Sequence, residues 1–166
     1  MKLMFILFAA YLLDLIFGDP HWLFHPICLI GNAISRGEKW IRLRFSKDEK
    51  GERRAGTVLA IFIVSMSFLL PLFLLMALKW IHPMISFIVE IFFCYQILAT
   101  KSLRTESMKV YDALQRNDIL EAQKFLSWIV GRDTENLTEA EIIKATVETV
   151  AENTSDGVIA PMIFMA

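Results

Sequence analysis

The chain has 166 residues, of which 55% are hydrophobic and 21% are charged, and its formal net charge is −1 at pH 7. Its mean hydropathy of +0.49 is higher than that of most soluble domains of this size. The net charge says nothing about partners, and no basic–aromatic pattern indicates nucleic acid. Cys28 and Cys94 are far apart and indicate neither a disulfide framework nor a zinc site.

The apolar residues are concentrated in blocks that predict membrane-spanning helices. Residues 57–78 carry no charge and are long enough to cross a bilayer core, and Pro71 inside them is tolerated but should kink the helix. Residues 81–100 form a further block, residues 3–17 a shorter one, and a fourth begins near residue 158. We therefore expect four spans.

The first block is compatible with two interpretations. Residues 3–17 could be a signal peptide, but no small-x-small cleavage site follows them, so a retained span or a tilted, partly re-entrant helix is preferred. Two blocks contain a carboxylate, Asp14 and Glu90, which is costly in lipid and should face protein or water. Each carboxylate either lies near a helix end or in a packed interface, or has a functional role.

Basic residues predict the orientation. Residues 19–56 are rich in Lys and Arg, whereas the link at 79–82 holds only Lys79 and His82. The positive-inside rule therefore places 19–56 and 101–157 in the cytoplasm, and the N-terminus and the short link outside; Lys2 opposes this slightly. The expected fold is a single all-α, polytopic membrane domain over residues 1–166 with cytoplasmic helical loops.

The polar segment 101–157 is predicted to be helical. Apolar residues recur at helical spacing over 101–116, and Asn117 then breaks the pattern. Asp118 is a predicted N-cap for a helix over 119–130, and the stretch "GRDTEN" that follows is a predicted loop.

A capping box predicts where the last polar helix begins. Thr138 and Glu141 have the spacing of such a box, which opens a helix to about residue 153. Polar side chains at three- and four-residue steps then form one stripe: Glu141, Lys144, Glu148 and Glu152. Such a stripe is usually a solvated face.

Three details favour a metal site on this stripe. Glu148 and Glu152 have no basic residue one turn away except Lys144, the helix ends with further oxygen ligands in Asn153 and Asp156, and an apolar run follows at once. Oxygen-rich clusters with one or two carboxylates plus phosphate suit Mg²⁺. The sequence therefore leaves a solvated face and a magnesium site as alternatives.

Two other polar stretches hold candidate site residues. In "GRDT", Arg132 is a bidentate donor for phosphate or carboxylate beside Asp133, or the two residues form a pair that fixes a turn. In "GDPHWLFHPICLIG", His21 and His25 are bracketed by prolines, which disfavours a transition-metal site and leaves a general base or phosphate ligand as the functional possibility. No nucleotide-binding glycine loop or serine nucleophile elbow occurs.

Three stretches resemble the signature stretches of one family. "GDPHWLFHPICLIG" at 18–31, "VGRDTENL" at 130–137 and "VETVAENTSDGVIAP" at 147–161 are similar to those of the cobalamin-biosynthesis membrane proteins called CbiB or CobD, the adenosylcobinamide-phosphate synthases. They occur in the family's order, and the resemblance covers the whole chain. Members of the family are about twice as long, so we expect the chain to be an N-terminal portion.

The resemblance implies an ATP- and Mg²⁺-dependent ligase of a bacterial or archaeal cell membrane. Such enzymes join aminopropanol phosphate, or a related amino alcohol phosphate, to adenosylcobyric acid. The implied catalytic residues are Asp19, His21 and His25. The implied substrate- and phosphate-binding residues are Arg132, Asp133 and Asn153, and the implied metal ligands are Glu148, Glu152 and Asp156.

The resemblance also implies partners and leaves alternatives. The implied partners are the corrinoid and amino alcohol phosphate substrates, membrane lipid and other corrinoid-synthesis enzymes, with no nucleic acid. A non-catalytic signalling or scaffold protein similar to AmpE is a second hypothesis, in which the motif residues only fix turns. A small transporter is a third, for which Asp14 and Glu90 would be the informative residues.

Overall fold

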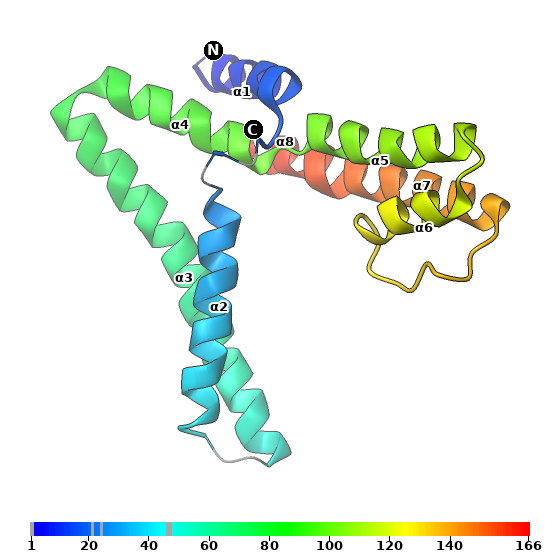
Figure 1. The fold of residues 1–166 in the computed structure, drawn as a ribbon. Coiled ribbons are helices and arrows are strands. Elements are labelled where there is room, and N and C mark those ends of the chain that lie inside the picture. The colour runs from blue at the N-terminus through cyan, green and yellow to red at the C-terminus, as the bar shows by residue number, and fades with distance from the viewer. Residues whose placement is uncertain (1, 21, 24, 46–47) are drawn as a thin grey trace. The chain divides into compact units, whose positions relative to one another are not determined.

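The computed structural model describes residues 2–20, 22–23, 25–45 and 48–166. Within these ranges the chain forms helices and no strand, which confirms the all-α prediction. The elements in chain order are α1 (Lys2–Phe17), α2 (Pro26–Arg42), α3 (Glu49–Ile81), α4 (Pro83–Ile97), α5 (Thr100–Gln115), α6 (Ile119–Ser127), α7 (Glu139–Thr154), the π-helical turn η1 (Ser155–Ile159) and α8 (Ala160–Met165) (Figure 1).

The chain divides into two compact units, and the boundary lies within α4. The first unit comprises Met1–Pro20 and Ile91–Ala166, and the second comprises His21–Glu90. Each unit is described by itself.

The second unit is built on a helical hairpin, in which α2 packs against α3 (Figure 1). Gly37 on α2 packs against the side chain of Leu59 on α3, because a Cβ atom at this position would be 2.5 Å from Cδ1 of Leu59. In α3, large apolar side chains such as those of Val64 (69% exposed) and Phe68 (66%) face outward. Exposed apolar surface of this extent is typical of a membrane or protein contact.

Two stretches are long and apolar enough to cross a membrane, judged by length and composition. They are Glu49–Ile81, which is α3, and Pro83–Gln115, which comprises α4 and α5. A 33-residue helix is about 50 Å long, which exceeds the hydrocarbon thickness of a bilayer. The helix continues through Pro71. The crossing of a membrane by α1 or by α8 stays a prediction, as does the orientation.

The first unit has a small apolar core where α5, α6 and α7 meet. Its fully buried members are Val110, Ala113, Ala122, Leu126, Ile142 and Ala145. Figure 1 shows α7 running alongside α5, with α6 packed across both at one end. These three helices carry the polar segment for which helices were predicted.

The local signals in this segment act as predicted. The side chain of Asp118 accepts a hydrogen bond from the backbone N–H of Glu121 at 2.9 Å and so caps α6. The capping box of α7 is present, with Oε2 of Glu141 accepting from the N–H of Thr138 at 2.8 Å and from its hydroxyl at 2.7 Å. These hydrogen bonds stabilise the carboxylate and lower the pKa of Glu141. The turn before α6 has a left-handed residue, Asn117, with φ of 57°.

The helix that starts at this box does not simply end near residue 153. It ends at Thr154 and passes into the π-helical turn η1 and then into α8. Pi-helical turns inside α-helices are rare and are frequent at functional sites.

Candidate functional site

Two of the motif stretches meet at the break between α4 and α5. The backbone N–H of Ala99 donates to the carbonyl of Gly157 at 3.2 Å, which ties η1 to this break. A Cβ atom at Gly157 would lie 3.6 Å from Cβ of Ala99, an ordinary van der Waals contact. The same break holds the end of α1, so the "GDP" and "DGV" stretches are attached to one short segment of chain.

Asp14 is the buried anchor of this junction. Its side chain is 0% exposed, and its Oδ2 atom accepts a hydrogen bond from the backbone N–H of Thr100 at 2.8 Å. This N–H is one of the donors that the first turn of a helix leaves without an intrahelical partner, so Asp14 on α1 caps α5. Its Oδ1 atom has no hydrogen-bond partner among the described residues. The expectation that Asp14 faces protein or water is therefore confirmed. Asp14 lies in a packed interface between α1 and α5, which is one of the positions expected for it.

The first turn of α5 also holds the "GDP" stretch. The hydroxyl of Ser102 donates to Oδ2 of Asp19 at 2.6 Å, and Nζ of Lys101 donates to the carbonyl of Ile16 at 2.5 Å. The hydroxyl of Tyr95 donates to the carbonyl of Gly18. Gly18 has φ of +60°, a left-handed conformation that favours glycine, and a Cβ atom there would make a tight 3.0 Å contact with Cδ of Lys101.

The sequence did not identify these junction residues. Tyr95, Lys101 and Ser102 belong to no recognised motif, and the sequence predicts only the end of a span and the start of a polar helix over residues 95–102. The only local signal is the dense run of hydroxyl and ammonium groups directly after an apolar block. Their partners lie more than 75 residues away in sequence, so the pairing requires the fold.

Arg132 lies opposite the acidic stripe of α7. Its Nη2 atom is 3.8 Å from Oε2 of Glu148, and Nζ of Lys144 is 3.7 Å from Oε1 of the same carboxylate. Glu148 therefore has a second cation nearby in addition to the predicted Lys144. Asp133 does not pair with Arg132; its Oδ1 atom accepts from the backbone N–H of Glu135 at 3.1 Å and fixes the turn in this way.

Arg132 and Asp133 also line a recess of about 470 Å³. The other lining residues are Leu120, Gln123, Lys124, Ser127, Thr134 and Glu135. Two hydrogen bonds hold its walls: the hydroxyl of Thr134 donates to the carbonyl of Gln123 at 2.9 Å, and Nε2 of Gln123 donates to the carbonyl of Leu137 at 2.9 Å. Lys124 and Arg132 give the recess two cationic groups, and Asp133 and Glu135 give it two carboxylates. The guanidinium of Arg132 can bind a phosphate or a carboxylate bidentately.

The predicted metal ligands follow one another along α7 and η1. Glu148, Glu152 and Asp156 are all exposed, and Nδ2 of Asn153 donates to the carbonyl of Thr149 at 2.9 Å. Within the described ranges, no three His, Cys, Asp or Glu side chains are close enough to hold a metal together. The donor set therefore does not fit an all-protein cage, but it fits Mg²⁺ held by one or two carboxylates together with substrate phosphates.

The predicted histidines have different outcomes. His25 is the N-cap of α2, where Nδ1 accepts from the backbone N–H of Ile27 at 3.2 Å and Pro26 occupies the first helical position. His21 lies outside the described residues. A catalytic role for either histidine stays a prediction.

The helical fold, the two apolar stretches and the polar helical segment together define an all-α protein of membrane type. The chain belongs to the CobD/Cbib protein family, whose model matches residues 7–166. No solved structure matches the chain.

Curated relatives support this assignment. The chain is 46% identical over 155 residues to the cobalamin biosynthesis protein CobD of Clostridium acetobutylicum. The alignment covers 93% of this chain and 49% of the relative. It is 43% identical to the protein of the same name from Geobacter metallireducens, with 96% of this chain and 49% of the relative aligned. It is 40% identical to the cobalamin biosynthesis protein CbiB of Salmonella typhi, with 94% of this chain and 49% of the relative aligned. The chain thus spans about half the length of the curated relatives it matches.

Proposed function

We propose that the chain acts in cobalamin biosynthesis and contributes to the site of an ATP- and Mg²⁺-dependent ligase. This ligase joins an amino alcohol phosphate to adenosylcobyric acid and gives adenosylcobinamide phosphate. The observation that carries the proposal is the attachment of the "GDP" and "DGV" stretches to the first turn of α5, through Ser102 and Ala99. Family membership and the names of the relatives support the pathway.

The proposed chemistry has two steps. A carboxylate is a poor electrophile, so the propionate carboxylate of the corrinoid first accepts the γ-phosphoryl group of ATP, which gives an acyl phosphate and ADP. The amine of the amino alcohol phosphate then attacks the carbonyl carbon, the C–N bond forms, the C–O bond to phosphate breaks, and inorganic phosphate leaves. The amine must lose protons before and after the attack, so a base is needed.

Phosphoryl transfer depends mainly on positioning and charge stabilisation. In the proposed site, Arg132 and Lys124 bind phosphate oxygens in their shared recess. One or two of the carboxylates of Glu148, Glu152 and Asp156 are the proposed protein ligands of Mg²⁺, with substrate phosphates completing the coordination. When bound, Mg²⁺ would neutralise phosphate charge. Because Nη2 of Arg132 lies 3.8 Å from Oε2 of Glu148, a phosphate that binds the guanidinium would compete with this carboxylate for it.

The proposed base lies near the "GDP" stretch. Asp19 has one carboxylate oxygen, Oδ2, held by Ser102 at 2.6 Å, which fixes the orientation of the carboxyl group. Asp19, His21 and His25 are the candidates that accept a proton from the attacking ammonium or bind phosphate. Asn153 is the proposed hydrogen-bonding contact of the substrate, through the amide oxygen.

A chimera tests the proposal in a protein of full length. The aligned 155 residues of the Clostridium acetobutylicum relative are replaced by the corresponding part of this chain, and the chimera is expressed in a strain that lacks the ligase and is given cobyric acid. We expect cobalamin-dependent growth, and adenosylcobinamide phosphate in extracts. Within the chimera, Glu152→Gln should lower the ligation rate at least tenfold and raise the Mg²⁺ concentration needed for half-maximal rate.

The control variant is Glu139→Gln, which removes an exposed carboxylate from the first turn of the same helix. A chimera present in the membrane at normal amount that makes no cobinamide product would contradict the ligase proposal. Normal product formation in extracts combined with failed corrinoid uptake would favour a transporter. If Glu152→Gln and Glu139→Gln change the ligation rate and the Mg²⁺ requirement equally, Glu152 is not a metal ligand.

A further inference from the structure

The N-terminal end of α3 carries a group of cations that the proposed reaction does not use. A recess of about 360 Å³ lies there, lined by Lys50, Arg53, Arg54, Thr57 and Val58. The spacing of the first four residues places them on one face of the helix, and all of them are exposed. The buried residues of this part of α3 are Gly51 and Ala55.

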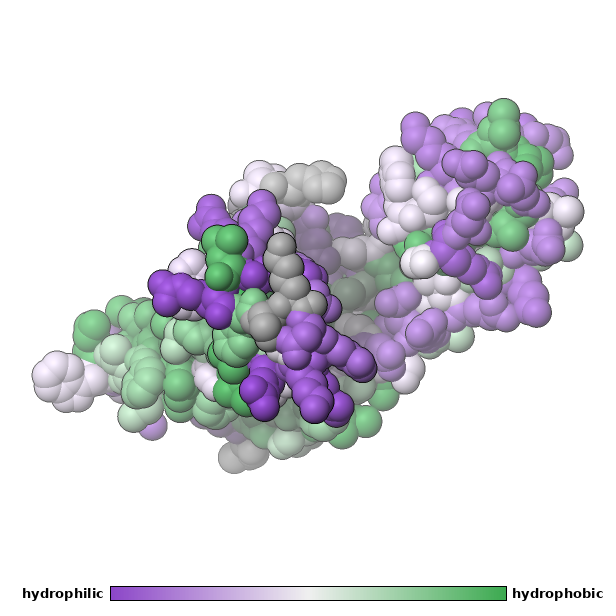
Figure 2. Space-filling model, turned by 90° about the horizontal axis from the view of Figure 1, so that it is seen from below, coloured by the Kyte–Doolittle hydropathy of each residue, from purple (hydrophilic) through white to green (hydrophobic). Residues whose placement is uncertain are grey.

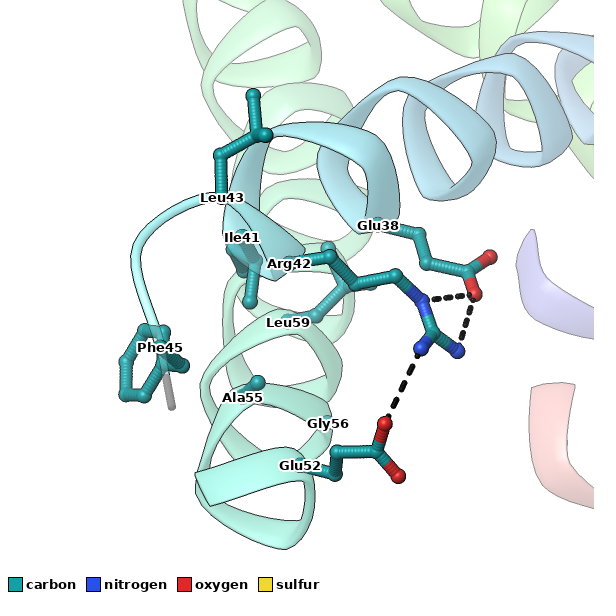
Figure 3. A pocket seen from close by; sticks show the side chains of 9 residues that line it. All are labelled: Glu38, Ile41, Arg42, Leu43, Phe45, Glu52, Ala55, Gly56 and Leu59. Carbon is teal, nitrogen blue, oxygen red and sulfur yellow. Dashed lines mark hydrogen bonds and ion pairs between the residues drawn. The ribbon is translucent and has the colours of Figure 1, made fainter. Parts of the chain in front are cut away.

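Among the described residues these cations have no anionic partner, unlike the arginine of the neighbouring recess. Arg42 contacts Glu38 at 2.9 Å and Glu52 at 3.4 Å, and these carboxylates raise its pKa. Figure 3 shows its guanidinium between the two carboxylates at the edge of a recess of about 610 Å³. In the described part of the chain, Lys50, Arg53 and Arg54 form no ion pair, so their charge is available to a ligand.

The surroundings indicate which anion fits. Residues 36–54 contain eight Lys and Arg against four Asp and Glu, a net charge of +4, and the uncharged run 57–78 begins directly after them. Figure 2, seen from the loop end of the α2–α3 hairpin, shows hydrophilic residues gathered at that end and hydrophobic surface along the helices behind it. A ligand at the recess would therefore contact cations on one side and a long apolar helix on the other.

We propose that Lys50, Arg53 and Arg54 bind the phosphate of an anionic phospholipid whose acyl chains lie along residues 57–78. Guanidinium groups match phosphate oxygens bidentately, and an ammonium group adds a point charge. The hydroxyl of Thr57 donates to the carbonyl of Arg53 at 2.9 Å, so the three cations, rather than this hydroxyl, hold the headgroup. A soluble phosphate would use the cations but not the apolar run, which is why the lipid is the better match.

Native mass spectrometry of the full chain, released from detergent micelles, tests the proposal. The chain is titrated with phosphatidylglycerol and, in parallel, with phosphatidylcholine of the same acyl chains. The wild-type chain should retain phosphatidylglycerol in preference. Arg53→Gln with Arg54→Gln should weaken that binding by about 25-fold, since each basic side chain near an anionic lipid surface contributes roughly fivefold.

The matched control is Arg36→Gln with Lys39→Gln, which removes the same charge from exposed positions of α2. This control should weaken phosphatidylglycerol binding by less than about threefold, because both residues lie outside the recess. Equal retention of the two lipids, or equal losses in the two double variants, would overturn the proposal. Displacement of the lipid by glycerol phosphate at similar concentration would assign the recess to soluble phosphates instead. No outcome depends on the proposed ligase reaction.

Discussion

Replacement of Asp14 tests whether the junction between α1 and α5 stabilises the first unit. Asp14→Ala removes the acceptor 2.8 Å from the N–H of Thr100, and a hydrogen bond to a charged group contributes about 1.5–3 kcal/mol. Loss of a fully buried carboxylate also removes its desolvation cost, so we expect a net loss of about 2 kcal/mol. For a chain of this size, this loss of unfolding free energy should lower the apparent melting temperature by about 4–8 °C. Asp14→Asn keeps an acceptor oxygen and should lose about half as much.

The assay is thermal unfolding of the full chain in detergent, followed by tryptophan fluorescence, together with hydrogen exchange of the Thr100 amide. Asp112→Ala is the matched control, because it removes an exposed carboxylate from α5 itself and should change stability by less than about 0.5 kcal/mol. The amide of Thr100 should exchange faster in Asp14→Ala but not in the control. If both alanine variants melt alike and exchange at Thr100 is unchanged, Asp14 does not cap α5.

Three further predictions follow from the first unit. Leu126→Ala, in the fully buried core, should cost about 2–5 kcal/mol of unfolding free energy, whereas Leu120→Ala at 79% exposure should cost under about 0.5 kcal/mol, as chemical denaturation will show. The hydrogen bonds from Thr138 lower the pKa of Glu141 in the folded state, so its contribution is complete above the ordinary pKa of a glutamate and is lost as the pH falls through the lower folded pKa. Denaturation across pH should therefore show the wild type losing stability relative to Glu141→Gln only in the acidic range, as this carboxylate is protonated. In the chimera, Ser102→Ala removes the hydroxyl that donates to Oδ2 of Asp19 and should lower kcat about tenfold with KM little changed, which Ser102→Thr should partly restore.

Local signals in the sequence were sufficient for the helices of the polar segment. Asp118 and the Thr138–Glu141 box were predicted as caps, and both act as caps in the structure. Such signals work because each partner lies within three residues, so the hydrogen bond forms wherever the helix forms. The same holds for the apolar stretch that became α3, whose length and lack of charge depend on no distant residue.

The junction could not be predicted in this way. Asp14 and Thr100 are 86 residues apart, and Ser102 and Asp19 are 83 apart, and nothing near either residue specifies the other. The π-helical turn at Ser155–Ile159 was not predicted either. The carbonyl of Gly157 in this turn accepts from the N–H of Ala99, a residue that is distant in sequence. Periodicity placed the acidic stripe of α7, but only the fold placed Arg132 against Glu148.

The separation between Asp14 and Thr100 has a consequence for synthesis of the protein. A ribosome adds about 5–20 residues per second, so the 86 residues between them take about 4–17 s to make. Throughout that interval α1 exists with its carboxylate lacking the amide that later receives it. The helix is therefore poorly suited to enter a lipid phase alone. The hydrogen bond that joins α1 to α5 can therefore form only after Thr100 has been made.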